Sequence, residues 1–247
     1  MFACVSKKRI TVKAVLRLKQ FFVAHDRCAM KVGTDGVLLG AWAPVDGVQS
    51  VLDIGSGSGL IALMLAQRNT KLRVDAVELD SDAAVQAQGN FTESPWAERL
   101  HVINQDIVSY SQLHSVQYDL IVSNPPYFEP AVACRDEKRD QARYTATLTH
   151  DVLLESAKSC LLSHGLFCLV LPYEVGEKMQ KMAENSGWFT AFRVNVSDKP
   201  TTAYHRMLLG IQLQETQTQV TSLALKDEKG EYTDEFRKLI QPFYVKY

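Results

Sequence analysis

The chain has 247 residues, of which 46% are hydrophobic and 22% are charged, and its formal net charge is −1. This composition fits one large folded domain with a sizeable core, and it argues against a chain that is disordered throughout. No apolar run approaches the roughly 18 residues of a membrane span, and the five cysteines form no Cys-x-x-Cys pair, so we expect a cytoplasmic protein without a membrane segment, a disulfide framework or a metal site.

Positive charge gathers at the N-terminus. Residues 1–31 contain eight Lys or Arg and one acid, Asp26, which gives this segment a charge of +7. Such a segment indicates a polyanionic partner, because clustered cations attract phosphate groups. The residues assigned to phosphate contacts are Lys7, Lys8, Arg9, Lys13, Arg17, Lys19 and Lys31, with Lys199 and Arg206 as weaker candidates.

The first 50 residues precede the predicted core and form an added element. Arg17–Val23 shows partial period-2 alternation, and Thr34–Trp42 is predicted to be a helix capped by Thr34 or Asp35. The same two side chains can also help to shape a cofactor pocket. We therefore expect residues 1–46 to be a basic extension packed on the core, and residues 47–247 to be the main domain.

The middle of the chain alternates strand-like and helix-like runs. This order predicts an α/β fold with a doubly wound, mostly parallel, Rossmann-like sheet. The predicted strands are Val51–Ile54, Arg73–Val77, Leu100–Ile103, Tyr118–Val122 and Leu166–Leu171, and the predicted helices are Leu60–Arg68, Ser81–Phe91, Leu148–Leu162 and Thr233–Ile240. A late antiparallel strand pair is expected from Trp188–Val196 and Arg206–Leu213.

Three glycines follow the first predicted strand. Gly55, Gly57 and Gly59 have GxGxG spacing, whereas a dinucleotide site needs GxGxxG and would place its third glycine at Leu60. Asp53, two residues before the first glycine, disfavours a pyrophosphate and tolerates a cationic ligand. S-adenosylmethionine carries an amino group and a sulfonium, so it fits this loop better than a dinucleotide does.

Acids also follow the next two strands. Glu78 ends the second strand and can accept hydrogen bonds from both hydroxyls of a ribose, while Asp106 follows the third strand and can bind the adenine amino group. The residues assigned to S-adenosylmethionine are therefore Asp53, Gly55, Gly57, Gly59, Glu78, Asp106, Thr34 and Asp35.

Asn124-Pro125-Pro126-Tyr127 follows the fourth predicted strand. The proline pair ends the strand and fixes the backbone, so the Asn124 amide oxygen and the Pro125 carbonyl can accept hydrogen bonds from one amino group. Tyr127 offers a flat face to a planar ligand. Because the first and fourth strands are neighbours in a doubly wound sheet, these four residues are predicted to face the methyl donor and to form the catalytic turn.

This turn resembles the signature of class I methyltransferases that act on planar nitrogens. A closer similarity covers nearly the whole chain and identifies it with the bacterial tRNA (adenine-N6)-methyltransferases that modify the adenosine beside the anticodon, position 37, of tRNA1(Val). It is carried by Lys19–Phe22, Met30–Trp42, Ser123–Phe128, Ala142-Arg143 and Tyr232–Phe236. The resemblance implies S-adenosylmethionine-dependent N6-methylation of tRNA, with Tyr127 stacked on the target base.

Several alternatives stay open from the residues alone. The same turn serves enzymes that methylate a protein glutamine amide, guanine N2 of rRNA or adenine N6 of DNA, and a non-catalytic RNA-binding protein can retain the fold. Loop 128–147 either closes over the substrate or is a disordered surface loop. The sequence gives no oligomeric state, and a monomer is the working expectation.

Overall fold

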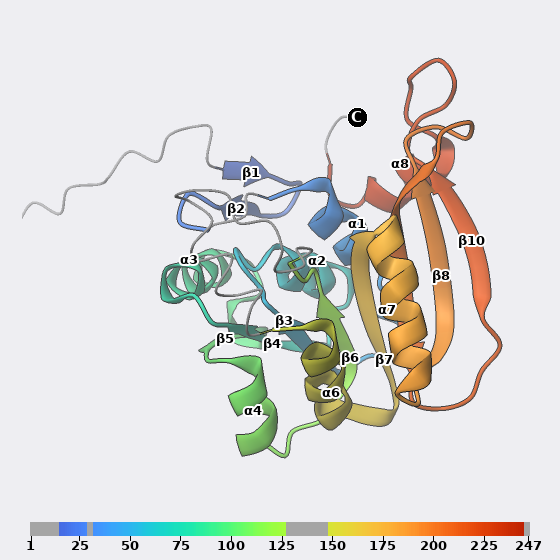
Figure 1. The fold of residues 1–247 in the computed structure, drawn as a ribbon. Helices are drawn as coiled ribbons and strands as arrows, with labels where there is room; N and C mark the ends of the chain where they lie inside the picture. The colour runs from blue at the N-terminus through green and yellow to red at the C-terminus, as the bar shows by residue number, and fades with distance from the viewer. Residues whose placement is uncertain (1–14, 29–31, 127–147, 245–247) are drawn as a thin grey trace, which may run out of the picture.

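An eight-stranded, mostly parallel sheet runs through the centre of the molecule (Figure 1). The computed structural model describes residues 15–28, 32–126 and 148–244. The strand order in space is β10-β8-β9-β7-β6-β3-β4-β5. The strands are β3 (Ser50–Ile54), β4 (Arg73–Glu78), β5 (Leu100–Asn104), β6 (Tyr118–Ser123), β7 (Leu161–Pro172), β8 (Phe189–Ser197), β9 (Tyr204–Gln212) and β10 (Gln219–Ala224).

The pairing pattern confirms the predicted fold class. In spatial order, strands β5, β4, β3, β6 and β7 are all parallel to one another. β3 lies between β4 and β6, as predicted for the first and fourth strands. β9 is antiparallel to both β7 and β8, which confirms the late antiparallel pair. β10 then adds to β8 in parallel.

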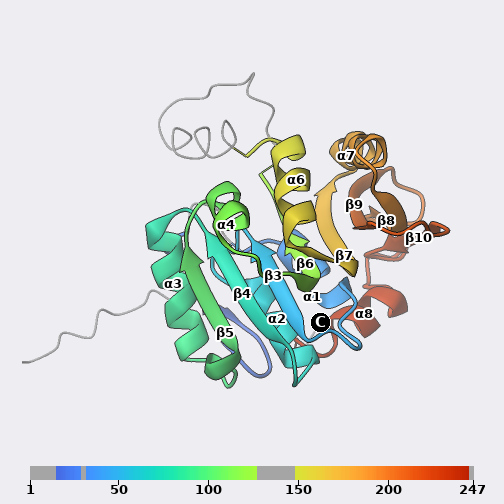
Figure 2. The same ribbon diagram turned by 90° about the horizontal axis from the view of Figure 1, so that it is seen from below.

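Helices cover both faces of the sheet (Figure 2). One apolar cluster takes in α1 (Thr34–Trp42), α2 (Leu60–Arg68), the end of α3 (Ser81–Thr92) and α8 (Asp234–Ile240). The other takes in α4 (Ile107–Leu113), α6 (His150–Cys160) and α7 (Tyr173–Asn185). A short 3-10 helix, η2, spans Ala97–Arg99. No helix among the described residues is long and apolar enough to cross a membrane.

Burial on both faces explains why the core strands are mainly apolar. Along β7, Cys168 and Val170 face the first cluster, while Phe167, Leu169 and Leu171 face the second. Successive side chains of a strand point to opposite faces, so a sheet covered on both sides needs apolar residues at every position. Cys168 is therefore a core residue, and Cys160 is likewise buried.

Among the described residues, α4, α7, β10 and the short helix η2 escaped the sequence-based prediction. Helix α7 is the clearest case, because its buried residues Gly176, Met179 and Ala183 have i, i+3 and i+7 spacing. This spacing is a helical period, so the helix could have been predicted from the sequence. β10 is an edge strand in which Leu223 is the buried residue, so it shows no apolar run.

The helix ends gave one wrong and one correct prediction. The N-cap of α1 is Gly33, which makes no side-chain capping bond, so the expected cap by Thr34 or Asp35 is wrong. At α8 the predicted cap is confirmed: the Thr233 hydroxyl accepts a hydrogen bond from the Phe236 N–H.

The N-terminal part shares the core of the main domain. The alternation over residues 17–23 resolves into a hairpin of β1 (Val15–Arg17) and β2 (Phe22–Ala24), and Leu18, Phe21 and Val23 are buried in the first cluster. Phe21 also meets Trp96 edge-on, with ring centroids 5.4 Å apart. A domain boundary between residues 46 and 47 stays a prediction.

Candidate active site

The glycine loop joins β3 to α2 through three residues with positive φ. Gly55, Gly57 and Gly59 have φ values of 71°, 54° and 77°. A Cβ placed on Gly55 or Gly57 would meet nothing within 4 Å, whereas a Cβ on Gly59 would lie 2.4 Å from the Phe91 ring. The first two glycines thus leave open space that a ligand can approach, and the third permits close packing of α2 against α3.

Asp53 is a buried carboxylate beneath this loop. It is 0% exposed, and neither of its oxygens accepts a hydrogen bond of normal geometry from a described residue. Burial raises its pKa to about 7; a weak backbone hydrogen bond from the Ala62 N–H acts in the opposite direction, and the charge of Glu78 adds to the increase. Because the carboxylate is costly to bury and lies beneath the loop, a cationic ligand over the loop would stabilise it through space and not by direct contact.

Glu78, at the end of β4, holds the loop in place. Its Oε2 accepts a hydrogen bond from the Gly57 N–H at 2.7 Å, and its Oε1 accepts one from the Asp80 N–H at 2.9 Å. Glu78 therefore fixes the backbone of the glycine loop and of the turn after β4, and its predicted contact with the ribose hydroxyls stays a prediction.

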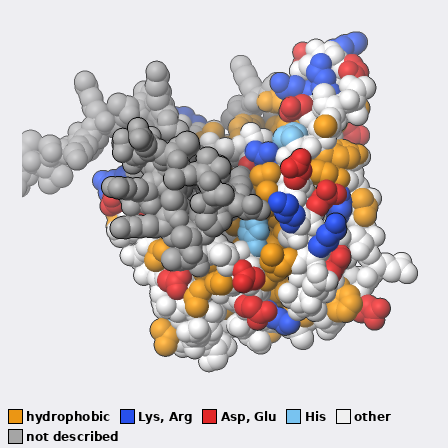
Figure 3. Space-filling view, in the orientation of Figure 1, with side chains coloured by type: hydrophobic (Ala, Val, Ile, Leu, Met, Phe, Trp, Pro, Cys, Tyr) orange, Lys and Arg blue, Asp and Glu red, His pale blue; other side chains and the backbone are white. Residues whose placement is uncertain are grey.

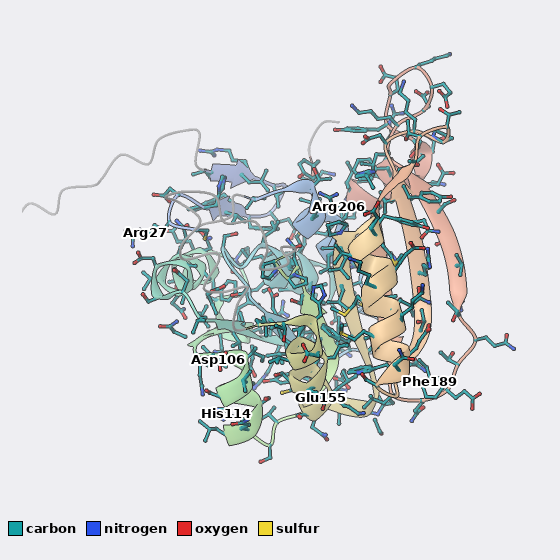
Figure 4. The ribbon with its side chains drawn as sticks, in the orientation of Figure 1. Arg27, Asp106, His114, Glu155, Phe189 and Arg206 are labelled. Atoms are coloured by element: carbon teal, nitrogen blue, oxygen red, sulfur yellow. The ribbon has the colours of Figure 1, made fainter. Side chains whose placement is uncertain are left out.

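Asp106 has a structural task in addition to the predicted one. It is the N-cap of α4, and its Oδ2 accepts hydrogen bonds from the Ser109 N–H and hydroxyl at 3.1 and 3.2 Å. It also lines a small pocket at the carboxyl ends of β3, β4 and β5, together with Ile54, Gly55 and Val77 (Figure 4). The pocket has a volume of about 10 Å³, roughly the room of one water molecule, so the predicted adenine contact of Asp106 stays a prediction.

Asn124 emerges from the sheet beside the glycine loop. Ser123 pairs with Ile54 across β6 and β3, and the Ser123 hydroxyl donates a hydrogen bond to the Ile54 carbonyl at 2.9 Å. The next residues on the two strands, Asn124 and Gly55, therefore leave neighbouring strand ends. Pro125 is buried, Asn124 and Pro126 are half-buried, and Tyr127 lies outside the described residues.

The start of α1 is tied to the late strand pair. Asp35 accepts a hydrogen bond at its Oδ1 from the Arg206 Nε at 2.8 Å, so its carboxylate joins two segments 171 residues apart (Figure 4). Thr34 is exposed and lines a second pocket, about 470 Å³ in volume, with Tyr232 and Phe236 of the α8 region. The assignment of both residues to the cofactor stays a prediction.

Two of the seven predicted tRNA-contacting residues can be placed. Arg17 is exposed on β1, and Lys19 is exposed with its ammonium donating to the Gln241 carbonyl at 2.6 Å. The ammonium retains two further donor hydrogens. The others lie outside the described residues: Lys7, Lys8, Arg9, Lys13 and Lys31.

The N-terminal hairpin reaches the cofactor edge through side chains of α3, a contact that was not predicted from the sequence. Asn90 on α3 donates to the carbonyls of Ala24 and Ser58, both at 2.8 Å, so one amide links the hairpin to the glycine loop. One turn earlier, Gln86 accepts the Arg27 N–H at 2.9 Å. Two buried amides four residues apart on one helix are the signal that could have indicated this docking.

Cys28 shows how close the hairpin comes to Glu78. Burial is the main cause that raises the pKa of its thiol to about 12, and the charges of Glu78, Asp80 and Asp26 add to the shift. The thiol is therefore neutral at physiological pH.

Within the described ranges, no group of three His, Cys, Asp or Glu side chains could hold a metal ion.

Comparison with known proteins identifies the family. The sequence profile of the methyltransferase small domain matches residues 36–191. A protein of Serratia proteamaculans (strain 568), named tRNA1(Val) (adenine(37)-N6)-methyltransferase, is 60% identical over 231 residues, which are 93% of this chain and 89% of that protein. A protein of the same name from Photorhabdus laumondii is 53% identical over 246 residues, 98% of this chain and 100% of its own.

Solved structures agree on the fold. A predicted O-methyltransferase from Agrobacterium tumefaciens superimposes with a TM-score of 0.66 at 16% identity, over 84% of this chain and 96% of that one. Because the profile covers more than half of the chain and both relatives match over almost its whole length, the chain belongs to the family of tRNA1(Val) (adenine(37)-N6)-methyltransferases.

Proposed function

We propose that this protein transfers a methyl group from S-adenosylmethionine to N6 of adenosine 37 in tRNA1(Val). The supporting observation is the pairing of Ser123 with Ile54, since it brings the ends of β6 and β3 together. The names of the relatives favour tRNA over a protein glutamine, rRNA guanine or DNA adenine substrate.

The residues around the glycine loop fit the proposed cofactor. Open space at Gly55 and Gly57 admits a ligand against the backbone, and the buried Asp53 carboxylate beneath the loop would attract the amino group of the methionine part through space. Glu78 would accept the ribose hydroxyls, and Asp106 the adenine amino group. When bound, S-adenosylmethionine supplies an electrophilic methyl group on a sulfonium.

Asn124 and Pro125 would position the nucleophile. The lone pair of adenine N6 is delocalised into the ring, which makes this nitrogen a poor nucleophile. If the Asn124 amide oxygen and the Pro125 carbonyl accept its two hydrogens, they stabilise the positive charge that develops on N6 as the new N–C bond forms. A strong general base is not required, because the proton can leave to solvent after transfer.

The remaining assignments complete the proposal. Tyr127 would stack on the extruded adenine, Arg17 and Lys19 would contact tRNA phosphates, and so would the five basic residues outside the described ranges. We also propose that the protein acts as a monomer in the cytoplasm. Light scattering on a size-exclusion column, with and without tRNA, tests the monomer.

A labelled methyl donor tests the substrate. The protein is incubated with tRNA1(Val) transcript, with the same transcript carrying guanosine at position 37, and with rRNA, DNA and total protein. Label in N6-methyladenosine after digestion of the first transcript, and its absence from the second, is the expected result. Label in any other pool with none in the first transcript would overturn the proposal.

A further inference from the structure

Two tyrosines lie beyond the same edge of the sheet as the catalytic turn. β6, which leads into Asn124, pairs with β7, and Ser123 is opposite Leu169. β7 continues to Pro172, which is opposite Arg206 near the start of β9. Tyr173 follows Pro172, and Tyr204 lies two residues before Arg206, so they lie three and four residues further along the strands than Asn124, on the next strand and the one after it. At about 3.3 Å per residue and 4.8 Å per strand, they lie roughly 11 and 16 Å from the turn.

The two rings form a supported aromatic surface. Their centroids are 5.4 Å apart with an interplanar angle of 31°, and Tyr204 is 42% exposed. Arg193 supports Tyr173 from β8: its Nη2 donates to the Tyr173 hydroxyl at 2.8 Å, and its guanidinium carbon lies 5.4 Å from the ring centroid.

Arg193 is itself held from three sides. Its Nε donates to Asn195 at 2.9 Å, its Nη1 donates to Gln180 at 3.0 Å, and Glu177 lies 3.3 Å from Nη2. Such a network fixes the guanidinium and therefore the ring of Tyr173 against which Tyr204 packs. A ring that is ordered before binding loses little entropy when a ligand stacks on it.

The exposed ring favours a nucleic acid as the partner, with cations of a mixed-charge surface within reach. Lys and Arg side chains, interspersed with acids, occupy the face over α7 and the loops above it (Figure 3). Lys178 and Lys181 are exposed on α7 together with Glu174 and Glu184. Lys199, whose ammonium donates to the Glu228 carbonyl at 3.3 Å, lies in the loop that leads to Tyr204. Exposed aromatic rings beside cations are the means by which proteins hold unpaired nucleotides.

We propose that Tyr204, supported by Tyr173 and Arg193, is a stacking platform for an unpaired nucleotide of the RNA substrate next to the methylated adenosine. The inference rests on the proposed function. An adenosine that turns into the active site leaves its neighbour without a stacking partner, and the Tyr204 ring can replace the lost contact.

The test compares three variants in steady-state methylation of tRNA. Tyr204→Ala is expected to raise KM for tRNA by about 5- to 140-fold with kcat within about twofold of wild type, whereas Tyr204→Phe keeps the wild-type KM. Phe189→Ala is the matched control: Phe189 is 37% exposed and pairs with Gln212 at the opposite end of the same strand pair (Figure 4). It should leave KM unchanged.

A spectroscopic arm separates stacking from a structural effect. An anticodon stem-loop with 2-aminopurine next to the target adenosine should lose fluorescence when it binds wild type or Tyr204→Phe, but not when it binds Tyr204→Ala. Wild-type KM and quenching in Tyr204→Ala, or an equal rise of KM in Phe189→Ala, would overturn the platform. If wild type itself does not methylate the tRNA, the proposed function fails instead.

Discussion

The two halves of the sheet edge are built differently. The half at β3, β4 and β5 is made of glycines and buried acids between residues 53 and 80, and its Glu78 side chain binds backbone N–H groups within the same stretch. The half at β6, β7 and β9 combines Asn124 with the aromatic and basic side chains of distant segments. A cofactor shared by many enzymes can be bound by a local motif, whereas the substrate half depends on tertiary assembly.

The largest expected effect separates the two halves at Asn124. Asn124→Ala removes one acceptor for the target amino group but leaves the glycine loop intact. The rate of methyl transfer should fall by about 10³-fold, while the Kd for S-adenosylmethionine, measured by calorimetry, stays unchanged. Wild-type turnover in this variant would contradict the proposed mechanism.

Asp53→Asn should act on the cofactor half in two opposite ways. The carboxyl group has a pKa of about 7 in the folded protein and an ordinary, lower value in the unfolded chain. The folded state thus binds more protons from about pH 4 to pH 7, so this group makes the apoprotein less stable as pH rises through that window. Asp53→Asn should therefore raise the free energy of unfolding of the apoprotein, by up to about 4 kcal/mol above pH 7.

The same change should weaken binding of the charged cofactor. Affinity for S-adenosylmethionine is expected to fall, whereas affinity for adenosine, which lacks the amino acid part, provides the control and should stay the same. Urea unfolding at several pH values and calorimetry with both ligands measure the two effects. Equal weakening for adenosine would argue against an attraction through space between Asp53 and the amino group.

The glycines of the cofactor loop should differ from one another. Gly57→Ala should destabilise the apoprotein only by the cost of a positive φ, about 1–2 kcal/mol, and its methyl group should obstruct the ligand. Alanine at Gly59 meets the same cost and also the Phe91 ring, so the apoprotein should lose about 1–3 kcal/mol more. Chemical denaturation measures the difference, and adding Phe91→Leu to Gly59→Ala should recover part of it.

The ion pair of Asp35 with Arg206 should give the smallest effect. The side chains are 19% and 30% exposed, so solvent screens part of their attraction. A double-mutant cycle with Asp35→Asn and Arg206→Gln should yield a coupling free energy of about 1 kcal/mol in unfolding. Additive effects would show that this contact does not join α1 to the late strand pair energetically.

The sequence by itself determined the fold class, the adjacency of the first and fourth core strands and the glycine motif. β3, β4 and β6 are mainly apolar because they are buried on both faces, although each contains one aspartate, and the glycine loop follows directly from its spacing. The strands and the loop are local features, and the alternation of strands and helices along the chain predicts how they combine. Helix α7 was missed although its buried residues Gly176, Met179 and Ala183 have the i, i+3, i+7 spacing of an amphipathic helix.

Only the tertiary structure decided how distant side chains meet. The sequence suggested that Asp35 caps a helix, yet its carboxylate is paired with Arg206, 171 residues away. Asn90 links the N-terminal hairpin to the glycine loop, and Tyr173 meets Tyr204 only because β9 folds back against β7. Hydrogen bonds and ring contacts between distant segments leave no periodic trace in the chain, so they become visible only when the sheet order is known.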